Sequence, residues 1–214
     1  MEKTSVPLAI LISGRGSNLR AIAEAATHGQ FGAHVAVVVS NRADAKGLQF
    51  AREAGLDAVV IPHGAFASRD QFDAAIIDLL RARGVRLVCL TGFMRVLGLR
   101  FCATFPNAIL NIHPSLLPAF PGEHAVRQAI EHGVKVSGAT VHFATADLDS
   151  GPIIVQEAVP VRDGDDADAL AARILEVEHR LYPEAIRRVA AGGWRVVGRR
   201  VLWDRGVSSS GHDG

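Results

Sequence analysis

Four continuous apolar runs, the first three of them each followed by a stretch with helical spacing, constrain this chain most strongly. They cover residues 8–12, 35–39, 58–61 and 87–90, and residues 108–110 form a fifth run of the same character. A strand that is apolar along its whole length has both faces buried, and such strands separated by helices form a parallel sheet covered on both sides. We therefore expect an α/β fold with three layers, α/β/α, around a mostly parallel sheet.

The second half of the chain has a different pattern. Residues 136–143 alternate in a way that suits a strand with one exposed face, and residues 153–155 predict another strand. A turn at residues 163–166 precedes a long helix, which Pro183 is expected to kink or restart. Trp194 to Leu202 reads as a small hairpin.

Length and composition indicate one ordinary globular domain. The chain has 214 residues, 49% of them hydrophobic and 21% charged, with no visible repeat or linker. Residues 1–205 are expected to form this single domain and residues 206–214 a disordered tail.

Charge and cysteine usage exclude several classes of partner. The net charge is +1 without a long run of one sign, so we expect no nucleic-acid partner. The apolar segment near the N-terminus is too short to span a membrane and lacks a signal-peptide pattern, so we expect no membrane association and a cytoplasmic location. Cys89 and Cys102 lie in or near apolar runs, which indicates buried thiols in a reducing compartment.

A glycine loop, Ser-Gly-Arg-Gly-Ser-Asn at residues 13–18, separates the first strand from a helical pattern over residues 19–26. Glycines allow close approach of a ligand, and the free N–H groups of a helix start attract an anion such as phosphate. Ser17 and Asn18 can cap the helix or contact that anion. The loop lacks the full dinucleotide and P-loop patterns, so a tight structural turn explains it equally well.

A second polar cluster follows the fifth apolar run, at Asn111 and His113 in a turn stiffened by Pro114. Two residues apart on a strand, both side chains point to the same face, where they suit a polarising and proton-donating pair. The alternative is a turn-capping amide beside a satisfied core histidine.

Ligands bind beyond the carboxyl ends of parallel strands, which places three loops on one edge of the sheet. These loops are residues 14–18, 92–97 and 111–118. The polar loop of residues 144–152 also ends a strand, although its carboxylates at Asp147 and Asp149 are explained most simply by turn hydrogen bonds.

Taken together, these loops resemble those of the folate-dependent formyltransferases, most closely the members that act on a ribonucleotide. The resemblance runs from residue 8 to about residue 183 and rests on residues 12–19, 92–97, 111–118 and 147–154, in this order and spacing. It implies the formyltransferase fold, with a Rossmann-like sheet.

The resemblance implies direct transfer of a formyl group from 10-formyltetrahydrofolate, the co-substrate, to the amine of 5-phosphoribosyl-glycinamide in de novo purine biosynthesis. These small molecules would be its partners, no metal would be needed, and the enzyme would be a monomer or homodimer. The family's catalytic trio falls on Asn111, His113 and Asp149. Asn111 and protonated His113 would donate to the oxygen that becomes negative, while Asp149 would favour the charged imidazole and help to move the amine's proton.

The resemblance also implies two sets of binding residues. The ribonucleotide would contact Gly16, Ser17, Asn18, Leu19, Arg20 and Glu178, although on sequence pattern alone Glu178 is a helix-surface carboxylate. The folate would contact Arg69, Met94, Arg95, Val96, Leu97, Asn111, Thr145, Ala146, Asp147, Leu148 and Asp149. His124 and His142 match family positions with supporting roles.

One segment departs from the family pattern. Many relatives carry a lysine shortly after Pro118, whereas this chain has Ala-Phe-Pro-Gly-Glu at residues 119–123. Arg20 or Arg127 would then replace the missing cation near the phosphate. Two alternative functions are a formyltetrahydrofolate hydrolase and a nucleotide-binding module without catalysis.

Overall fold

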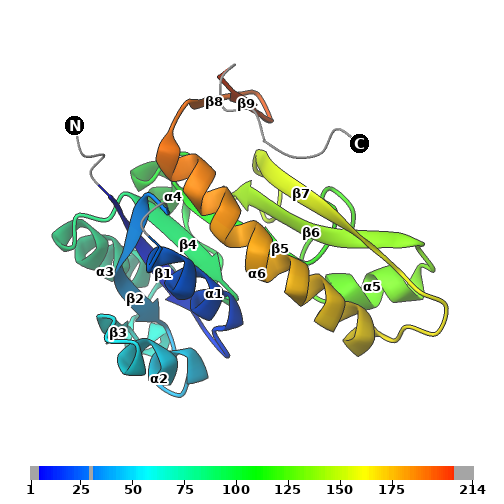
Figure 1. Ribbon diagram of the computed structural model, residues 1–214. Helices are drawn as coiled ribbons and strands as arrows, with labels where there is room; N and C mark the ends of the chain where they lie inside the picture. Colours follow the sequence, from blue (N-terminus) through cyan, green and yellow to red (C-terminus); the bar gives the residue numbers. More distant parts are fainter. Residues whose placement is uncertain (1–4, 29–30, 205–214) are drawn as a thin grey trace.

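The computed structural model describes residues 5–28 and 31–204, and these form three layers around one sheet (Figure 1). Within the described residues the sheet has nine strands in the order β3-β2-β1-β4-β5-β6-β7-β9-β8. The strands are β1 (Val6–Ile12), β2 (Ala33–Ser40), β3 (Ala58–Val60), β4 (Leu87–Thr91), β5 (Ile109–His113), β6 (Val136–Phe143), β7 (Ile153–Pro160), β8 (Trp194–Val197) and β9 (Arg200–Trp203). The helices are α1 (Ser17–Ala26), α2 (Lys46–Glu53), the 3-10 turn η1 (His63–Ala65), α3 (Arg69–Ala82), α4 (Leu99–Thr104), α5 (Ala125–Glu131) and α6 (Ala167–Ala191).

The five apolar runs form the parallel half of the sheet, as predicted. Neighbouring strands from β3 to β5 pair in parallel, and β6 and β7 continue the sheet in antiparallel pairing. The chain leaves β1 toward β2 on one side and returns to β4 on the other. The carboxyl ends of β1 and β4 therefore meet at the switch point where α/β sheets bind ligands.

Each face of the sheet has its own hydrophobic core, which confirms the three-layer prediction. One core packs beneath α1, α2, α5 and α6, and the other beneath α3 and α4. Tyr182 of α6 is fully buried, and its hydroxyl donates to the carbonyl oxygens of Leu90 (3.1 Å) and Leu110 (2.7 Å). This contact fixes α6 on the two strands β4 and β5, whose ends carry candidate site loops.

Two predictions about the second half of the chain are wrong. Strand β6 is buried on both faces from Ser137 onward, because α6 packs on one face and the turn at residues 115–117 packs on the other. Helix α6 continues as one helix through Pro183, so this proline does not restart it. The short elements α4 and η1 were not anticipated.

The predicted hairpin is present as β8 and β9, and it extends the main sheet. Ile153 of β7 pairs in parallel with Arg200 of β9. The predicted tail at residues 206–214 lies outside the described residues. Both cysteines are free thiols, and burial raises the pKa of Cys89 to about 12. In the described part of the chain, no helix has the length and apolar character needed to span a bilayer.

Candidate active site

The glycine loop turns tightly at Gly16, which caps α1 in the left-handed conformation with φ of 75°. A Cβ at Gly16 would lie 2.8 Å from the Cα of Gly47, so the start of α2 packs directly beneath the loop. The N–H of Gly47 donates to the carbonyl oxygen of Gly14 at 3.0 Å. Because the side chain of Leu19 is fully buried in the core, any contact of Leu19 with a ligand is confined to its main chain.

Glu178 is buried, which corrects its reading as a helix-surface carboxylate. The amide of Asn18 donates to its Oε2 at 2.8 Å, and each residue is only 8% exposed. Burial raises the pKa of Glu178, while the hydrogen bond from Asn18 opposes that rise. Helix α6 thus brings a carboxyl group against the first turn of α1.

Asn111, His113 and Asp149 come together at the end of β5. The Nδ1 of His113 lies 3.4 Å from Oδ2 of Asp149, and the amide nitrogen of Asn111 lies 3.4 Å from Oδ1 of the same carboxylate. The side chains of His113 and Asp149 are 6% and 5% exposed. The simpler interpretation of Asp149, as a turn-forming carboxylate, is wrong: its carboxylate points into the cluster, and its second oxygen also accepts from the N–H of Gly122 at 2.8 Å.

Both nitrogens of the His113 ring face acceptors. Nε2 lies 2.8 Å from the carbonyl oxygen of Phe120, to which it must donate, and Nδ1 faces the Asp149 carboxylate. Only the charged imidazolium can donate at both nitrogens. The longer contact, at Nδ1, is the one that a substrate oxygen can share.

The amide of Asn111 is oriented by His142. Nδ1 of His142 donates to the carbonyl oxygen of Phe143 at 3.1 Å, so in the neutral ring Nε2 accepts from the Asn111 amide at 3.2 Å. The tautomer therefore turns the Asn111 N–H groups toward His142 and Asp149. This contact gives His142 the supporting position expected for it, whereas His124 caps α5 and is exposed.

The environment of Asp149 keeps it ionised. Burial alone raises its pKa, but the adjacent rings of His142 and His113 and the hydrogen bond from the Gly122 N–H lower the pKa overall. Asp149 has a φ of 48°, and Phe120, which accepts from His113, has a φ of 51°. Positive φ values at bulky or branched residues store strain that concentrates at functional sites.

The turn after His113 is held by side chains of the neighbouring strands. Thr140 of β6 accepts from the N–H of Leu117 at 3.1 Å and donates to the carbonyl oxygen of Ser115 at 2.6 Å. Gln156 of β7 donates to the carbonyl oxygen of Leu117 at 2.8 Å. Sequence reasoning missed both residues, because Thr140 was placed in a strand with one exposed face and Gln156 lies just beyond the predicted strand of residues 153–155.

The segment predicted to bind folate is tied to the glycine loop. The hydroxyl of Ser13 accepts from the N–H of Met94 at 2.8 Å and donates to Oδ1 of Asn41 at 2.6 Å. Ser13 and Asn41 are buried, and no sequence motif singled them out for this contact. The hydroxyl holds the 92–97 segment against the end of β1.

Exposed apolar side chains line this region. Met94 is 68% exposed, Val96 50% and Leu148 60%, whereas the side chain of Leu97 is buried and can offer only its main chain. Arg69 approaches the same segment, with its Nε 3.8 Å from where a Cβ on Gly98 would lie. The remaining predicted folate residues, Arg95, Thr145, Ala146 and Asp147, lie in the same two segments, and the structure leaves Arg95, Thr145 and Asp147 exposed.

The two arginines expected near the phosphate are engaged elsewhere. The guanidinium of Arg20 lies over the ring of Phe50, 4.8 Å from its centroid, on the side of α1 that faces α2. Arg127 is exposed and pairs with Glu131 at 2.7 Å. Among the described residues, no group of three or more His, Cys, Asp or Glu side chains is arranged to hold a metal ion.

A mostly parallel sheet with a glycine loop at its switch point and an Asn, His and Asp cluster at the same edge defines an α/β protein with a candidate small-molecule site at that edge. The chain belongs to the formyl transferase family, whose model matches residues 6–186.

Individual relatives agree with this assignment. The phosphoribosylglycinamide formyltransferase of Escherichia coli K12 is 44% identical over 185 residues, which cover 86% of this chain and 87% of the relative. The trifunctional purine biosynthetic protein adenosine-3 of chicken is 44% identical over 92% of this chain, and this chain spans about a fifth of its length (20%).

Solved structures show the same similarity. Glycinamide ribonucleotide transformylase 1 from Symbiobacterium toebii superposes with a TM-score of 0.92 at 54% identity, over 95% of this chain and 96% of the other. Phosphoribosylglycinamide formyltransferase from Anaplasma phagocytophilum superposes with a TM-score of 0.87 at 39% identity, over 96% and 97%.

Proposed function

We propose that this protein transfers a formyl group from 10-formyltetrahydrofolate to the amine of 5-phosphoribosyl-glycinamide, a step of de novo purine biosynthesis. The observation that carries the proposal is the meeting of Asn111, His113 and Asp149 at the strand edge next to the glycine loop. The names and the coverage of the single-domain relatives support this reaction over hydrolysis and over binding without catalysis.

In the proposed reaction, the substrate amine attacks the formyl carbon. The carbonyl oxygen becomes negative in the tetrahedral intermediate, where the Asn111 amide and the His113 imidazolium donate hydrogen bonds to it. The intermediate collapses by breaking the bond between the formyl carbon and the folate nitrogen, and that nitrogen takes up the proton that the attacking amine released through Asp149, so it leaves as a neutral secondary amine. Ionised Asp149 stabilises the imidazolium and accepts the proton that the attacking amine gives up, directly or through water.

Each substrate has a proposed place around this cluster. The phosphate lies on the amides of Gly16, Ser17 and Asn18 at the start of α1, and Glu178 accepts from the ribose hydroxyls. The folate ring lies between the segments that carry Met94 and Leu148, where exposed apolar side chains flank polar main chain. The absence of a metal requirement, the cytoplasmic location and the monomeric or homodimeric state stay predictions.

The test replaces the residues of the cluster. His113→Ala and Asp149→Asn are each expected to lower kcat by about two orders of magnitude or more, because each removes charge stabilisation of the intermediate. The measurement is spectroscopic turnover of 10-formyltetrahydrofolate with and without the ribonucleotide. His34→Ala is the control, since His34 is exposed and its ring contacts Ser5.

The same assay separates the alternatives. Loss of the formyl group without the acceptor would indicate a hydrolase, and no turnover by the wild-type protein would indicate a binding module. Near-normal rates in folded His113→Ala or Asp149→Asn would contradict the proposed mechanism.

A further inference from the structure

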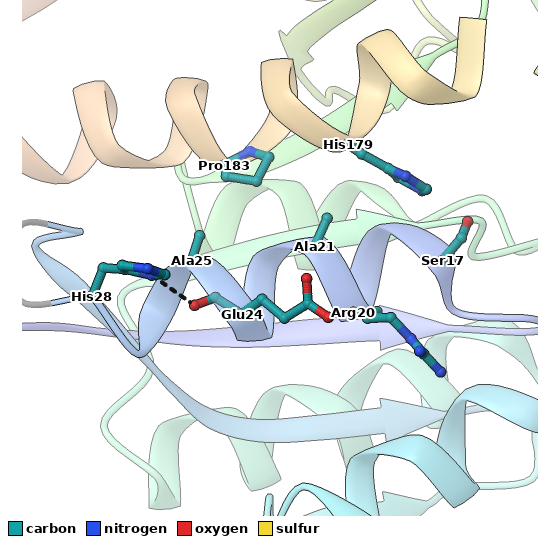
Figure 2. Close-up of a pocket in the computed structure, with 8 residues that line it drawn as sticks. All are labelled: Ser17, Arg20, Ala21, Glu24, Ala25, His28, His179 and Pro183. Atoms are coloured by element: carbon teal, nitrogen blue, oxygen red, sulfur yellow. Dashed lines mark hydrogen bonds between the residues drawn. The ribbon is translucent and has the colours of Figure 1, made fainter. Parts of the chain in front are cut away.

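A groove of about 330 Å³ runs between α1 and α6, beginning at Ser17 of the glycine loop. Figure 2 shows Ser17, Ala21 and His28 along α1 and His179 on α6 facing them across the groove. The small side chain of Ala21 leaves the space open. The mouth of this groove is therefore continuous with the proposed phosphate site.

His179 has an unexplained ring nitrogen in this groove. Its Nε2 is buried, yet it makes no hydrogen bond with any residue in the described part of the chain. The ring extends from α6 over Ala21 toward Ser17 (Figure 2). A buried polar atom without a partner costs about 1–3 kcal/mol, so such atoms usually have a ligand or water to bind. At the other end of the groove, His28 is already satisfied, with Nδ1 3.0 Å from the carbonyl oxygen of Glu24.

Asn18 supplies the complementary group at the same end of the groove. It is only 8% exposed, and its Oδ1 also has no hydrogen-bond partner among the described residues. Its Nδ2 is used by Glu178, the residue next to His179. An unpaired ring nitrogen that lines the groove and an unpaired amide oxygen in the first turn of α1 suit a sugar phosphate, since the phosphate accepts and a hydroxyl donates.

A positive charge is expected near the phosphate, and His179 is one of the residues that can supply it. Arg127 pairs with Glu131, whereas Arg20 lines the groove itself and lies over the ring of Phe50. The glycine loop offers main-chain N–H groups and one cation, Arg15, whose side chain is exposed. A histidine on the opposite wall can supply both a donor and, when protonated, a charge.

We propose that His179 is a binding residue for the phosphate group of the ribonucleotide, donating from Nε2 to a phosphate oxygen held on the amides at the start of α1. This inference rests on the proposed function. It adds to the site a residue from α6 that takes the place of the lysine missing after Pro118.

The test compares His179→Ala with His28→Ala, a matched removal of a histidine from the same groove. In His179→Ala we expect the KM for the ribonucleotide to rise about tenfold or more, with kcat and the KM for folate changed less than about twofold, because the contact is equal in ground and transition states. The inhibition constant of inorganic phosphate should rise by a similar factor. His28→Ala should leave all four quantities unchanged, and His179→Gln, which keeps an N–H donor, should recover part of the loss.

Thermal unfolding of each variant shows whether it is folded, and His179→Gln serves if His179→Ala is not. An unchanged ribonucleotide KM and phosphate affinity in a folded His179 variant would overturn the inference, as would an equal effect of His28→Ala. Titration with inorganic phosphate needs no reaction, so it tests His179 even if the wild-type protein transfers no formyl group. A wild-type protein that transfers no formyl group would overturn the proposed function and leave the inference about His179 to the phosphate titration.

Discussion

Asp149 is the residue on which the other site side chains converge. Its carboxylate faces Asn111, His113 and His142, and it reaches them from a left-handed backbone conformation that is held by the Gly122 N–H. A neutral carboxyl could not balance the imidazolium of His113, so the lowered pKa of Asp149 is part of the arrangement. The charge state of the cluster thus depends on contacts from three separate segments.

The pKa of Glu178 is shifted in the opposite direction from that of Asp149, because burial raises it and the side chain that donates to Glu178, Asn18, is a neutral amide. A carboxyl group with these properties is costly to keep ionised in the folded protein. Its retention at this position is expected if it binds hydroxyl groups of the substrate.

We therefore predict that Glu178→Gln stabilises the protein while weakening ribonucleotide binding. The folded protein holds the Glu178 proton to a higher pH than the unfolded chain, whose carboxyl has a pKa near 4.5. The wild-type protein accordingly loses stability as the pH rises from that value through the raised folded pKa, and the loss persists above it. Glutamine does not ionise, and its amide oxygen can still accept from Asn18.

The measurement is the melting temperature at pH 4 and pH 8. We expect the variant to melt on the order of a few degrees higher than the wild type at pH 8, with the difference smaller at pH 4. The KM for the ribonucleotide should rise about tenfold. If the wild-type protein melted at the same temperature as Glu178→Gln at pH 8, or at a higher one, this account of Glu178 would be contradicted.

At the scale of elements, the start of α2 sets the shape of the glycine loop. Gly47 is the second residue of α2, and its N–H donates to the carbonyl oxygen of Gly14. A Cβ at Gly47 would lie 2.8 Å from Cδ1 of Ile12 and 3.2 Å from the Cα of Gly16. Two glycines in contact therefore allow α2 to begin directly beneath the start of α1, where the phosphate is proposed to bind.

Gly47→Ala is predicted to displace the loop. Although alanine suits a helix better than glycine, the added methyl group must push Ile12 or the backbone of Gly16, and overpacking of this kind costs about 1–3 kcal/mol. We expect a lower melting temperature and a ribonucleotide KM raised severalfold. Gly64→Ala is the control, because a Cβ there meets no atom within 4 Å. If Gly47→Ala bound the ribonucleotide as well as Gly64→Ala does, the proposed role of this packing would be wrong.

At the scale of the whole molecule, burial explains which parts of the fold could be predicted. The five parallel strands are apolar throughout because helices cover both of their faces, and the positions of their loops follow from strand direction. Strand β6 is equally buried but carries Thr140 and His142, whose polar groups bond to the turn after β5 and to Asn111. The sequence shows the polarity of these residues and not their partners, so the strand was misread as exposed.

In the candidate site, too, the sequence predicted contacts between neighbouring residues but not contacts between distant ones. Asn111 and His113 are close in sequence and share a strand, which made them visible as a pair. Glu178 was read as exposed because its partner Asn18 is 160 positions away, and the bond of Ser13 to Met94 spans 81 positions. Only tertiary structure, or a family resemblance, can bring such residues together.

The C-terminal hairpin braces the loop that carries Asp149, although neither is near the other in sequence. The ring of Trp194 in β8 packs against Phe143, the last residue of β6, with 5.0 Å between ring centroids. Arg200 of β9 pairs with Ile153, the first residue of β7. Both ends of the loop between β6 and β7 are thus held by the hairpin, and the position of Asp149 depends on them.

Trp194→Ala is therefore predicted to lower kcat as well as stability. Loss of a half-buried indole that also donates to the carbonyl oxygen of Val189 should cost about 2 kcal/mol, less than for a fully buried tryptophan. Loosening of the Asp149 loop should lower kcat severalfold, while the KM for the ribonucleotide stays nearly constant, because α1 and the glycine loop are held by other elements. Trp203→Ala is the matched control: Trp203 lies in the same hairpin, but its ring packs against Arg188 of α6 and is not the one that contacts Phe143. Both variants should melt earlier than the wild type, but only Trp194→Ala should lose turnover at a temperature where both are folded. An equal loss of kcat in the two variants would show that the hairpin acts through general stability and not through the Asp149 loop.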